Sequence, residues 1–339
     1  MTGTHRPHLL GLAIACALCA ATAHADDTTA PNKPRELEAV QVQGNVLGSS
    51  SKENVRTYAG SRKVIGSEDL ATGANRSLDD ALQQVPGIKI FDETGTGVLP
   101  QIMLRGLYES RSGRVQVLED GIPLSLAPYG QTSLSLFPVT MNQIDRIDIV
   151  RGGAAVQYGP NNVGGVINLV SKPIPERWTT TLGEKITAGG AGRYLRDTTL
   201  STGGYLTPDF GLQVDADWNK GQYWREHSGT DVKNLRLRAE WWLADDKLLK
   251  AQVQRYVANM DMAGALSVAD YEENPRQATR PLDRFTGRTT RASLTWQQDL
   301  GAWGPFDQSQ FTWTNFSAEL GPKQLEHMVI VTGIVTDSA

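Results

Sequence analysis

Cysteine, histidine and long apolar segments are scarce in this chain of 339 residues. Both cysteines, Cys16 and Cys19, and three of the five histidines lie in the first 25 residues. The rest of the chain therefore has no thiol for a disulfide, and its two histidines make a histidine-based metal site improbable. A mean hydropathy of -0.33 also excludes a polytopic helical membrane protein, which needs repeated apolar spans of about 20 residues.

The chain also lacks a charge excess and a catalytic motif. It has 33 basic and 37 acidic residues, and this near-neutral balance argues against nucleic acid as a partner. No Ser/His/Asp arrangement, HExxH motif or phosphate-binding GxxxxGK[ST] loop is visible. We therefore expect neither an enzyme nor a resident cofactor.

The first 25 residues have the pattern of a secretory signal peptide. An apolar run over residues 9–23 is too short to span a bilayer, and Ala23-His24-Ala25 gives a small-x-small cleavage site. The mature chain is then expected to begin at Asp26. Lipidation at Cys16 or Cys19 is an alternative, but the residues before each cysteine fit it poorly.

Residues 26–59 are expected to form a polar linker with one β-prone segment, Glu36–Val42. Two interpretations of this segment remain open. It is either an ordinary first strand or an extended peptide that pairs with the sheet edge of another protein, with Val40 and Val42 on one face. The segment consists of Glu36, Leu37, Glu38, Ala39, Val40, Gln41 and Val42.

A shift in composition divides the rest of the chain into two parts. All eight tryptophans lie at or beyond Trp178, whereas residues 60–176 read as a small α/β domain. In that domain we expect a short helix from Ser67, a second helix after a capping-box-like Ser77, and a tight turn at Asp120-Gly121. Strands are expected at 114–118, 144–150 and 163–170.

From residue 177 onwards, apolar and polar residues alternate with a period of two. About seven segments of roughly ten residues have one apolar face and one charged face, with tryptophans at their ends. A soluble sandwich also alternates, but a transmembrane β-barrel explains the terminal aromatics and the alternation of short and long connections. The expected strands are near 178–188, 194–203, 210–219, 233–243, 247–257, 288–298 and 308–316.

The size of the α/β domain indicates how large a barrel would be needed to enclose it. A domain of about 110–120 residues has a diameter of about 35 Å, and a barrel that encloses such a plug needs about 22 strands. We therefore expect residues 60–176 to plug a 22-stranded barrel, of which residues 177–339 supply the first strands. Residues 320–339 lose the alternation, so the chain is expected to be truncated, either as a fragment or by a frameshift.

Two motifs carry a family resemblance. The glycine-rich run Ile144–Leu169, and the segment Met103–Gly106 upstream of it, closely resemble the plug signature of TonB-dependent outer-membrane receptors. The resemblance implies a location in the outer membrane of a Gram-negative bacterium. It also implies that Glu36–Val42 is the TonB box, which pairs with TonB and so receives energy from the TonB–ExbB–ExbD system. Arg105 and Arg151 are implied to pair with acids of the barrel wall.

Within this family the sequence is most similar to receptors for ferric dicitrate. The resemblance implies that Thr96 and Gln131, at apices of the plug, contact the ligand. The stretches that carry it are residues 120–123, 127–131, 224–228, 264–271 and 279–285.

Four arginines recur at every fourth position from Arg276 to Arg288 on the longest expected external loop. Arg276, Arg280 and Arg284 are candidates for steering an anionic ferric chelate, while lipopolysaccharide phosphates are an alternative partner for external arginines. The expected function is TonB-dependent uptake of a ferric chelate, with ferric citrate as the first candidate. The alternatives are another siderophore or small nutrient, an enzyme or adhesin on a barrel, and a non-functional receptor fragment.

Overall fold

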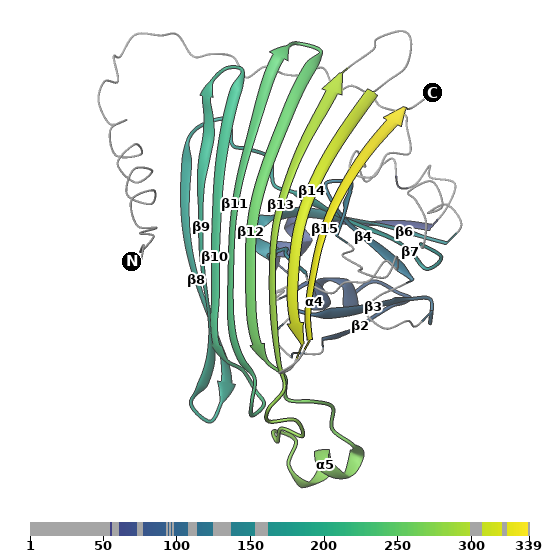
Figure 1. Ribbon diagram of the computed structural model, residues 1–339, viewed down its shortest axis with the longest axis vertical. Coiled ribbons are helices and arrows are strands. Elements are labelled where there is room, and N and C mark those ends of the chain that lie inside the picture. The colour runs from purple at the N-terminus through teal and green to yellow at the C-terminus, as the bar shows by residue number, and fades with distance from the viewer. Residues whose placement is uncertain are drawn as a thin grey trace, which may run out of the picture. The chain divides into compact units, whose positions relative to one another are not determined.

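The computed structural model describes residues 55, 61–72, 77–92, 94, 96, 98–107, 114–124, 137–152 and 162–298, together with the backbone of 307–320 and 324–337. The expected signal peptide, the TonB box over residues 36–42 and Gln131 lie outside this described part. Within it are the two structures that the sequence predicts, a small α/β domain and a long antiparallel sheet, here called the plug domain and the meander (Figure 1).

A mixed five-stranded sheet forms the centre of the plug domain. Its order is β1-β6-β7-β4-β5, and β4 and β7 are parallel whereas the other pairs are antiparallel. A separate hairpin pairs β2 with β3. The strands are β1 (Ser61–Ile65), β2 (Ile88–Asp92), β3 (Pro100–Leu104), β4 (Val115–Glu119), β5 (Ile122–Pro123), β6 (Ile144–Arg151) and β7 (Gly165–Ser171).

Short helices accompany this sheet, and one expectation about them is wrong. Helix α3 (Ser67–Thr72) and helix α4 (Leu78–Gln83) lie where the sequence predicts them, and a 3₁₀ turn, η2, covers Met141–Gln143. Ser77 is the N-cap of α4, but its side chain makes no capping hydrogen bond. Burial of the apolar face of α4 in the domain core, through Leu78 and Leu82, therefore stabilises the helix in place of a capping box.

The turn expected at Asp120-Gly121 is confirmed. Asp120 and Gly121 have φ values of 50° and 82°, which is the pattern of the hairpin turn that suits the twist of two adjacent strands. The turn joins β4 to β5 and places Glu119, the last residue of β4, at the end of the sheet.

The meander consists of eight antiparallel strands in sequence order. It has one strand more than the sequence predicts, because β15 occupies residues that lack alternation. Met328–Val331 is a continuous apolar run, so the period-two pattern fails there although the backbone pairs with β14. The strands are β8 (Thr179–Gly190), β9 (Arg193–Thr207), β10 (Phe210–Gln222), β11 (Gly229–Ala244), β12 (Lys247–Asp261), β13 (Arg284–Gln298), β14 (Asp307–Leu320) and β15 (Gln324–Asp337).

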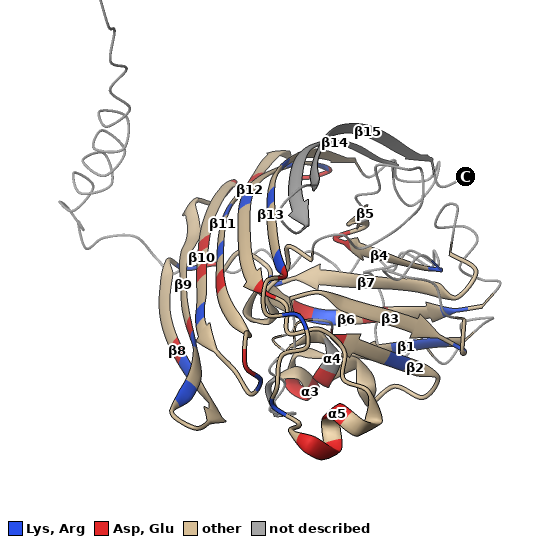
Figure 2. Ribbon diagram, turned by 60° about the horizontal axis from the view of Figure 1, so that its bottom comes forward, with Lys and Arg blue, Asp and Glu red and all other residues tan. Residues whose placement is uncertain are grey.

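The connections follow the predicted alternation of short and long except between β8 and β9, where a two-residue turn at 191–192 lies at the end that carries the long loops. Two-residue turns at 208–209 and 245–246 join strands at one end of the meander, while residues 223–228 and 262–283 form longer loops at the other end. The loop 262–283 holds helix α5 (Val268–Glu273), and Figure 2 shows the acidic residues on it. Within the described residues, no helix is long and apolar enough to cross a membrane.

Burial in the meander is the reverse of that in a soluble sheet. On β11 the polar side chains of Asn234 and Arg236 are only 2% and 1% exposed, while Leu235 and Leu237 beside them are 54% and 43% exposed. The polar face is covered because it contacts the plug domain, and the opposite face, here called the outer face, is apolar. Barrels that cross a membrane present an apolar face of this kind to lipid.

Aromatic side chains border this apolar surface. Strand pairing aligns Phe210 with Trp241, Trp241 with Leu249, and Leu249 with Trp296 in one row at the short-turn end. Trp218 lies eight residues further along β10, which corresponds to about 26 Å along a strand. That spacing matches the roughly 25 Å apolar band with aromatic girdles that barrels present to lipid.

Candidate functional site at the contact between plug domain and meander

A buried charge network joins the plug domain to the meander at Glu119. One carboxylate oxygen of Glu119 accepts from Arg236 at 3.2 Å and the other accepts from Arg291 at 2.5 Å. Arg236 also contacts Asp215 at 3.2 Å, and the Arg236 and Glu119 side chains are only 1% and 3% exposed. Removing one partner of a buried ion pair leaves the other charge buried and uncompensated. This network therefore holds the plug domain against the meander at a defined position.

A second polar contact centres on Asp217 of β10. Its carboxylate accepts hydrogen bonds from Thr140 at 2.9 Å, Asn142 at 2.6 Å and Gln143 at 2.5 Å, all in or next to η2. Asn234 of β11 adds a longer bond at 3.4 Å. Three hydrogen-bond donors in or next to η2 therefore bind a single carboxylate of the meander. These charge-assisted bonds fix the position of the 3₁₀ turn against β10.

Two further bonds use backbone carbonyls of the plug domain. Gln254 donates to Pro138 O at 2.6 Å, and Arg238 donates to Lys172 O at 2.7 Å. Together with the Glu119 and Asp217 contacts, they make much of this interface polar. Water can replace such partners when the surfaces separate, so a polar interface is better suited than an apolar core to reversible movement.

The end of the interface near the long loops is apolar instead. Val98 and Leu99, which follow β2 and Thr96, pack against meander side chains that share one buried cluster. The meander members of that cluster are Val232, Tyr256, Ala258, Met260 and Phe285. This packing places the plug segment around Thr96 towards the end of the meander that carries the long loops.

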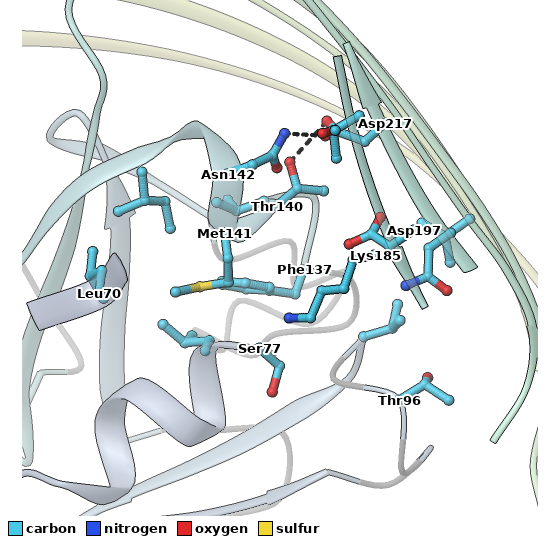
Figure 3. A pocket seen from close by; sticks show the side chains of 18 of the residues that line it. Leu70, Ser77, Thr96, Phe137, Thr140, Met141, Asn142, Lys185, Asp197 and Asp217 are labelled. Carbon is cyan, nitrogen blue, oxygen red and sulfur yellow. Dashed lines mark hydrogen bonds between the residues drawn. The ribbon is translucent and has the colours of Figure 1, made fainter. Parts of the chain in front are cut away.

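A cavity of about 570 Å³ lies between the plug domain and strands β8 to β12. Thr96 lines it, as do Lys185, Asp197 and Asp217 of the meander and Met141 of η2. Figure 3 shows Lys185 and Asp197 from the meander opposite Phe137 and Met141 of the plug domain. The cavity therefore has a charged wall on the meander side, while the plug side mixes apolar residues with polar ones such as Ser77, Asn142 and Lys172.

The Thr96 hydroxyl is held by a local turn. Thr94 bonds through its hydroxyl to Asp92 at 2.8 Å and to the Thr96 hydroxyl at 2.9 Å. Thr94 is 8% exposed, whereas Thr96 is half-buried and faces the cavity. Thr96 and Gln131 are the two plug residues expected to contact ligand. Thr96, which lies in the described part, thus lines a cavity, and its hydroxyl is oriented by the Thr94 hydroxyl.

The candidate arginines after residue 275 do not gather at this cavity. The Arg276 guanidinium stacks on Trp224 at 5.7 Å, and exposed Arg280 pairs with Asp283 at 3.3 Å. Arg284 pairs with Asp261 at 2.8 Å and lies on the outer face, because its neighbour Phe285 packs towards Val98 and Leu99. A spacing of four residues therefore does not correspond to a common face here.

Arg225 is not among the site residues expected from the sequence. It connects the two long loops by hydrogen bonds. It donates to Gln277 O at 2.6 Å and also to the backbone oxygen of Gly264. Partial desolvation lowers the pKa of Arg225 from its ordinary value. This arginine orders the loop 262–283 through its carbonyls, so its role in the structure is to shape the loop.

Arg105 and Arg151 contact the plug domain itself. Arg151 donates to Pro86 O at 2.5 Å, and the Arg105 guanidinium lies so close to Gly152 that a Cβ there would be 2.7 Å from it. Their expected pairing with wall acids stays a prediction. The ion pairs of Glu119 with Arg236 and Arg291 have the opposite polarity, with the carboxylate on the plug domain and the arginines on the wall.

Comparison with known proteins agrees with this architecture. The family model "TonB-dependent Receptor Plug Domain" matches residues 54–166. The vitamin B12 transporter BtuB of Vibrio cholerae is 28% identical over 194 residues, which are 56% of this chain and 30% of BtuB.

Solved structures match over more of the chain. The unliganded ferric citrate transporter FecA is 35% identical with a TM-score of 0.71, covering 80% of this chain and 42% of FecA. The siderophore receptor PirA of Acinetobacter baumannii, at 18% identity and a TM-score of 0.63, supports the fold alone. The chain thus spans less than half of these relatives, all of which are named as transporters or receptors.

Proposed function

Because this chain carries the plug domain and barrel strands of a TonB-dependent receptor, we propose that the protein imports a ferric chelate across the outer membrane with energy supplied through TonB. The observation that carries this proposal is the reversed burial of the meander. Its outer face suits lipid, and its polar face holds a plug by hydrogen bonds and ion pairs that can be broken and re-formed.

Energy must reach the plug from elsewhere, since the outer membrane has neither ATP nor a proton gradient of its own. We propose that Glu36–Val42 pairs as an added strand with TonB, which works with ExbB and ExbD at the inner membrane. Main-chain hydrogen bonds of a strand give a directional connection that can transmit a pull. The polar contacts at Glu119 and Asp217 are the ones that such a pull would have to break.

Ferric citrate is the chelate we propose, because FecA, at 35% identity, is named as a ferric citrate transporter. Thr96 and Gln131 would donate hydrogen bonds to citrate carboxylates. Arg276 and Arg280, on the external loop, would attract the anion. Arg284 is less suited to this role, given its place on the outer face.

Uptake by cells tests the assignment directly. Cells that carry the gene and lack other iron receptors are expected to accumulate labelled iron from ferric citrate, and to do so only when TonB is present. Ferric enterobactin and cyanocobalamin serve as comparison substrates. Uptake of either one, with no uptake of ferric citrate, would refute ferric citrate as the substrate but would support the TonB-dependent transport function. Failure to import any of the three, by protein shown to be in the outer membrane, would refute the transport proposal.

Thr96→Val is expected to weaken ferric citrate binding about tenfold or more, because it removes a hydrogen bond to a charged ligand while keeping the side-chain shape. Binding to whole cells without TonB measures this affinity separately from transport. Thr286→Val, on the outer face of β13, is the matched control and should bind as the unaltered protein does. If Thr96→Val also binds normally, Thr96 is not a ligand contact.

A further inference from the structure

The guanidinium of Arg276 lies where three connections of the meander meet. It stacks on the ring of Trp224 in the loop 223–228, with 5.7 Å between the guanidinium carbon and the ring centre. It also lies against Gly190, the last residue of β8, so closely that a Cβ there would be 2.7 Å from one of its nitrogens. A glycine at position 190 is therefore what leaves room for the guanidinium in this place.

The backbone at Arg276 is fixed by the loop 223–228. The N–H of Glu226 donates to the carbonyl of Arg276 at 2.7 Å, and the Arg225 side chain donates to the carbonyl of Gln277 at 2.6 Å. Two neighbouring carbonyls of the loop 262–283 are thus held by one short segment. The guanidinium is therefore positioned before a ligand arrives, which reduces the entropy that binding would cost.

Arg276 differs from the other two candidate arginines in its charge balance. Arg280 pairs with Asp283, and Arg284 pairs with Asp261. Among the residues that the structure describes, no carboxylate pairs with the half-buried guanidinium of Arg276. Its positive charge is therefore not neutralised there by a neighbouring acid.

We propose that Arg276 binds a carboxylate of the ferric chelate directly, and that Gly190 determines this specificity by admitting the guanidinium. This inference rests on the proposed function and names the ligand class, a chelate that carries carboxylates. A guanidinium offers parallel N–H donors that match the two oxygens of a carboxylate, and stacking on Trp224 leaves the donors in its plane free. The site lies at the end of the meander towards which Thr96 also lies.

The substitution Gly190→Ala tests the proposal while the charge of Arg276 is kept. The added methyl group should displace the flexible end of the arginine, so ferric citrate should bind about tenfold more weakly to whole cells without TonB. Gly192→Ala is the matched control. Gly190 and Gly192 have φ values of 76° and 74°, but a Cβ on Gly192 would have nothing within 4 Å. Gly192→Ala should therefore bind as the unaltered protein does.

A double-mutant cycle separates the guanidinium contact from a general effect on the fold. Arg276→Gln removes the charge and should weaken ferric citrate binding at least as much as Gly190→Ala does. Adding Gly190→Ala to Arg276→Gln should cause no further loss, because both substitutions act on the same contact. Losses that add in the double variant would show that Gly190 does not act through Arg276, and would overturn its proposed role.

Three other outcomes would overturn the proposal. Equal losses from Gly190→Ala and Gly192→Ala would show that backbone strain causes the effect. Normal binding by Arg276→Gln would show that Arg276 is not a ligand contact; if those cells still import ferric citrate through TonB, this inference fails and the proposed transport function stands. Uptake of ferric enterobactin, which has no carboxylate, by unaltered protein that binds no ferric citrate would refute the ligand class but support TonB-dependent transport.

Discussion

Deletion of residues 36–42 is expected to abolish iron uptake while leaving ferric citrate bound at the cell surface. The reason is that binding uses the outward end of the receptor, whereas release into the periplasm requires work delivered through the proposed contact with TonB. Uptake and surface binding of labelled ferric citrate, measured on the same cells, separate the two effects. Deletion of residues 45–51, also seven residues long, is the matched control and should retain uptake.

A substitution distinguishes strand pairing from mere linker length. Val40→Pro removes one backbone N–H and fixes φ, so it should interrupt an added strand and lose most uptake, whereas Val40→Ala should retain it. Uptake that survives both the deletion and Val40→Pro would refute the proposed tether.

Glu119→Ala is expected to loosen the plug domain, because it leaves the buried guanidinium groups of Arg236 and Arg291 without their shared carboxylate. Breaking one side of a buried ion pair costs about 3–5 kcal/mol, so amide exchange in β4 should become about 100-fold faster or more. Hydrogen exchange followed by mass spectrometry on peptides that cover residues 115–119 measures this.

An exposed ion pair gives the control for Glu119. Glu184 and Arg196 contact each other on the outer face, with side chains 36% and 60% exposed. Glu184→Ala should change local exchange little, because exposed pairs contribute about 0–1 kcal/mol. Equal effects of Glu119→Ala and Glu184→Ala would contradict the view that the Glu119 network locks the plug domain to the meander.

Local patterns in the sequence were sufficient for most elements. Alternation located seven of the eight strands of the meander, since side chains of a strand face two sides in turn. It missed β15, where a run of apolar residues hides the period. The apolar spacing correctly predicted the helix at Leu78. The capping hydrogen bond expected from Ser77 is absent.

The candidate site was harder to predict, since its residues meet only in three dimensions. Asp217 and Arg236 could be assigned to the polar face of their strands, but nothing in the sequence indicates that Gln143 or Glu119 contacts them. These partners are 74 and 117 residues apart. Conversely, the regular spacing of Arg276, Arg280 and Arg284 suggested a cluster that a loop and a strand do not form.

The sequence by itself determined the two-part organisation, the apolar character of one side of the meander and the family resemblance of Ile144–Leu169. Each depends on the order of residue types along a short segment, which fixes backbone periodicity and local solvation. Only the tertiary structure decided which polar residues of the wall hold the plug domain and where Thr96 lies. Those features depend on strand register and on contacts between distant segments, and no local pattern specifies them.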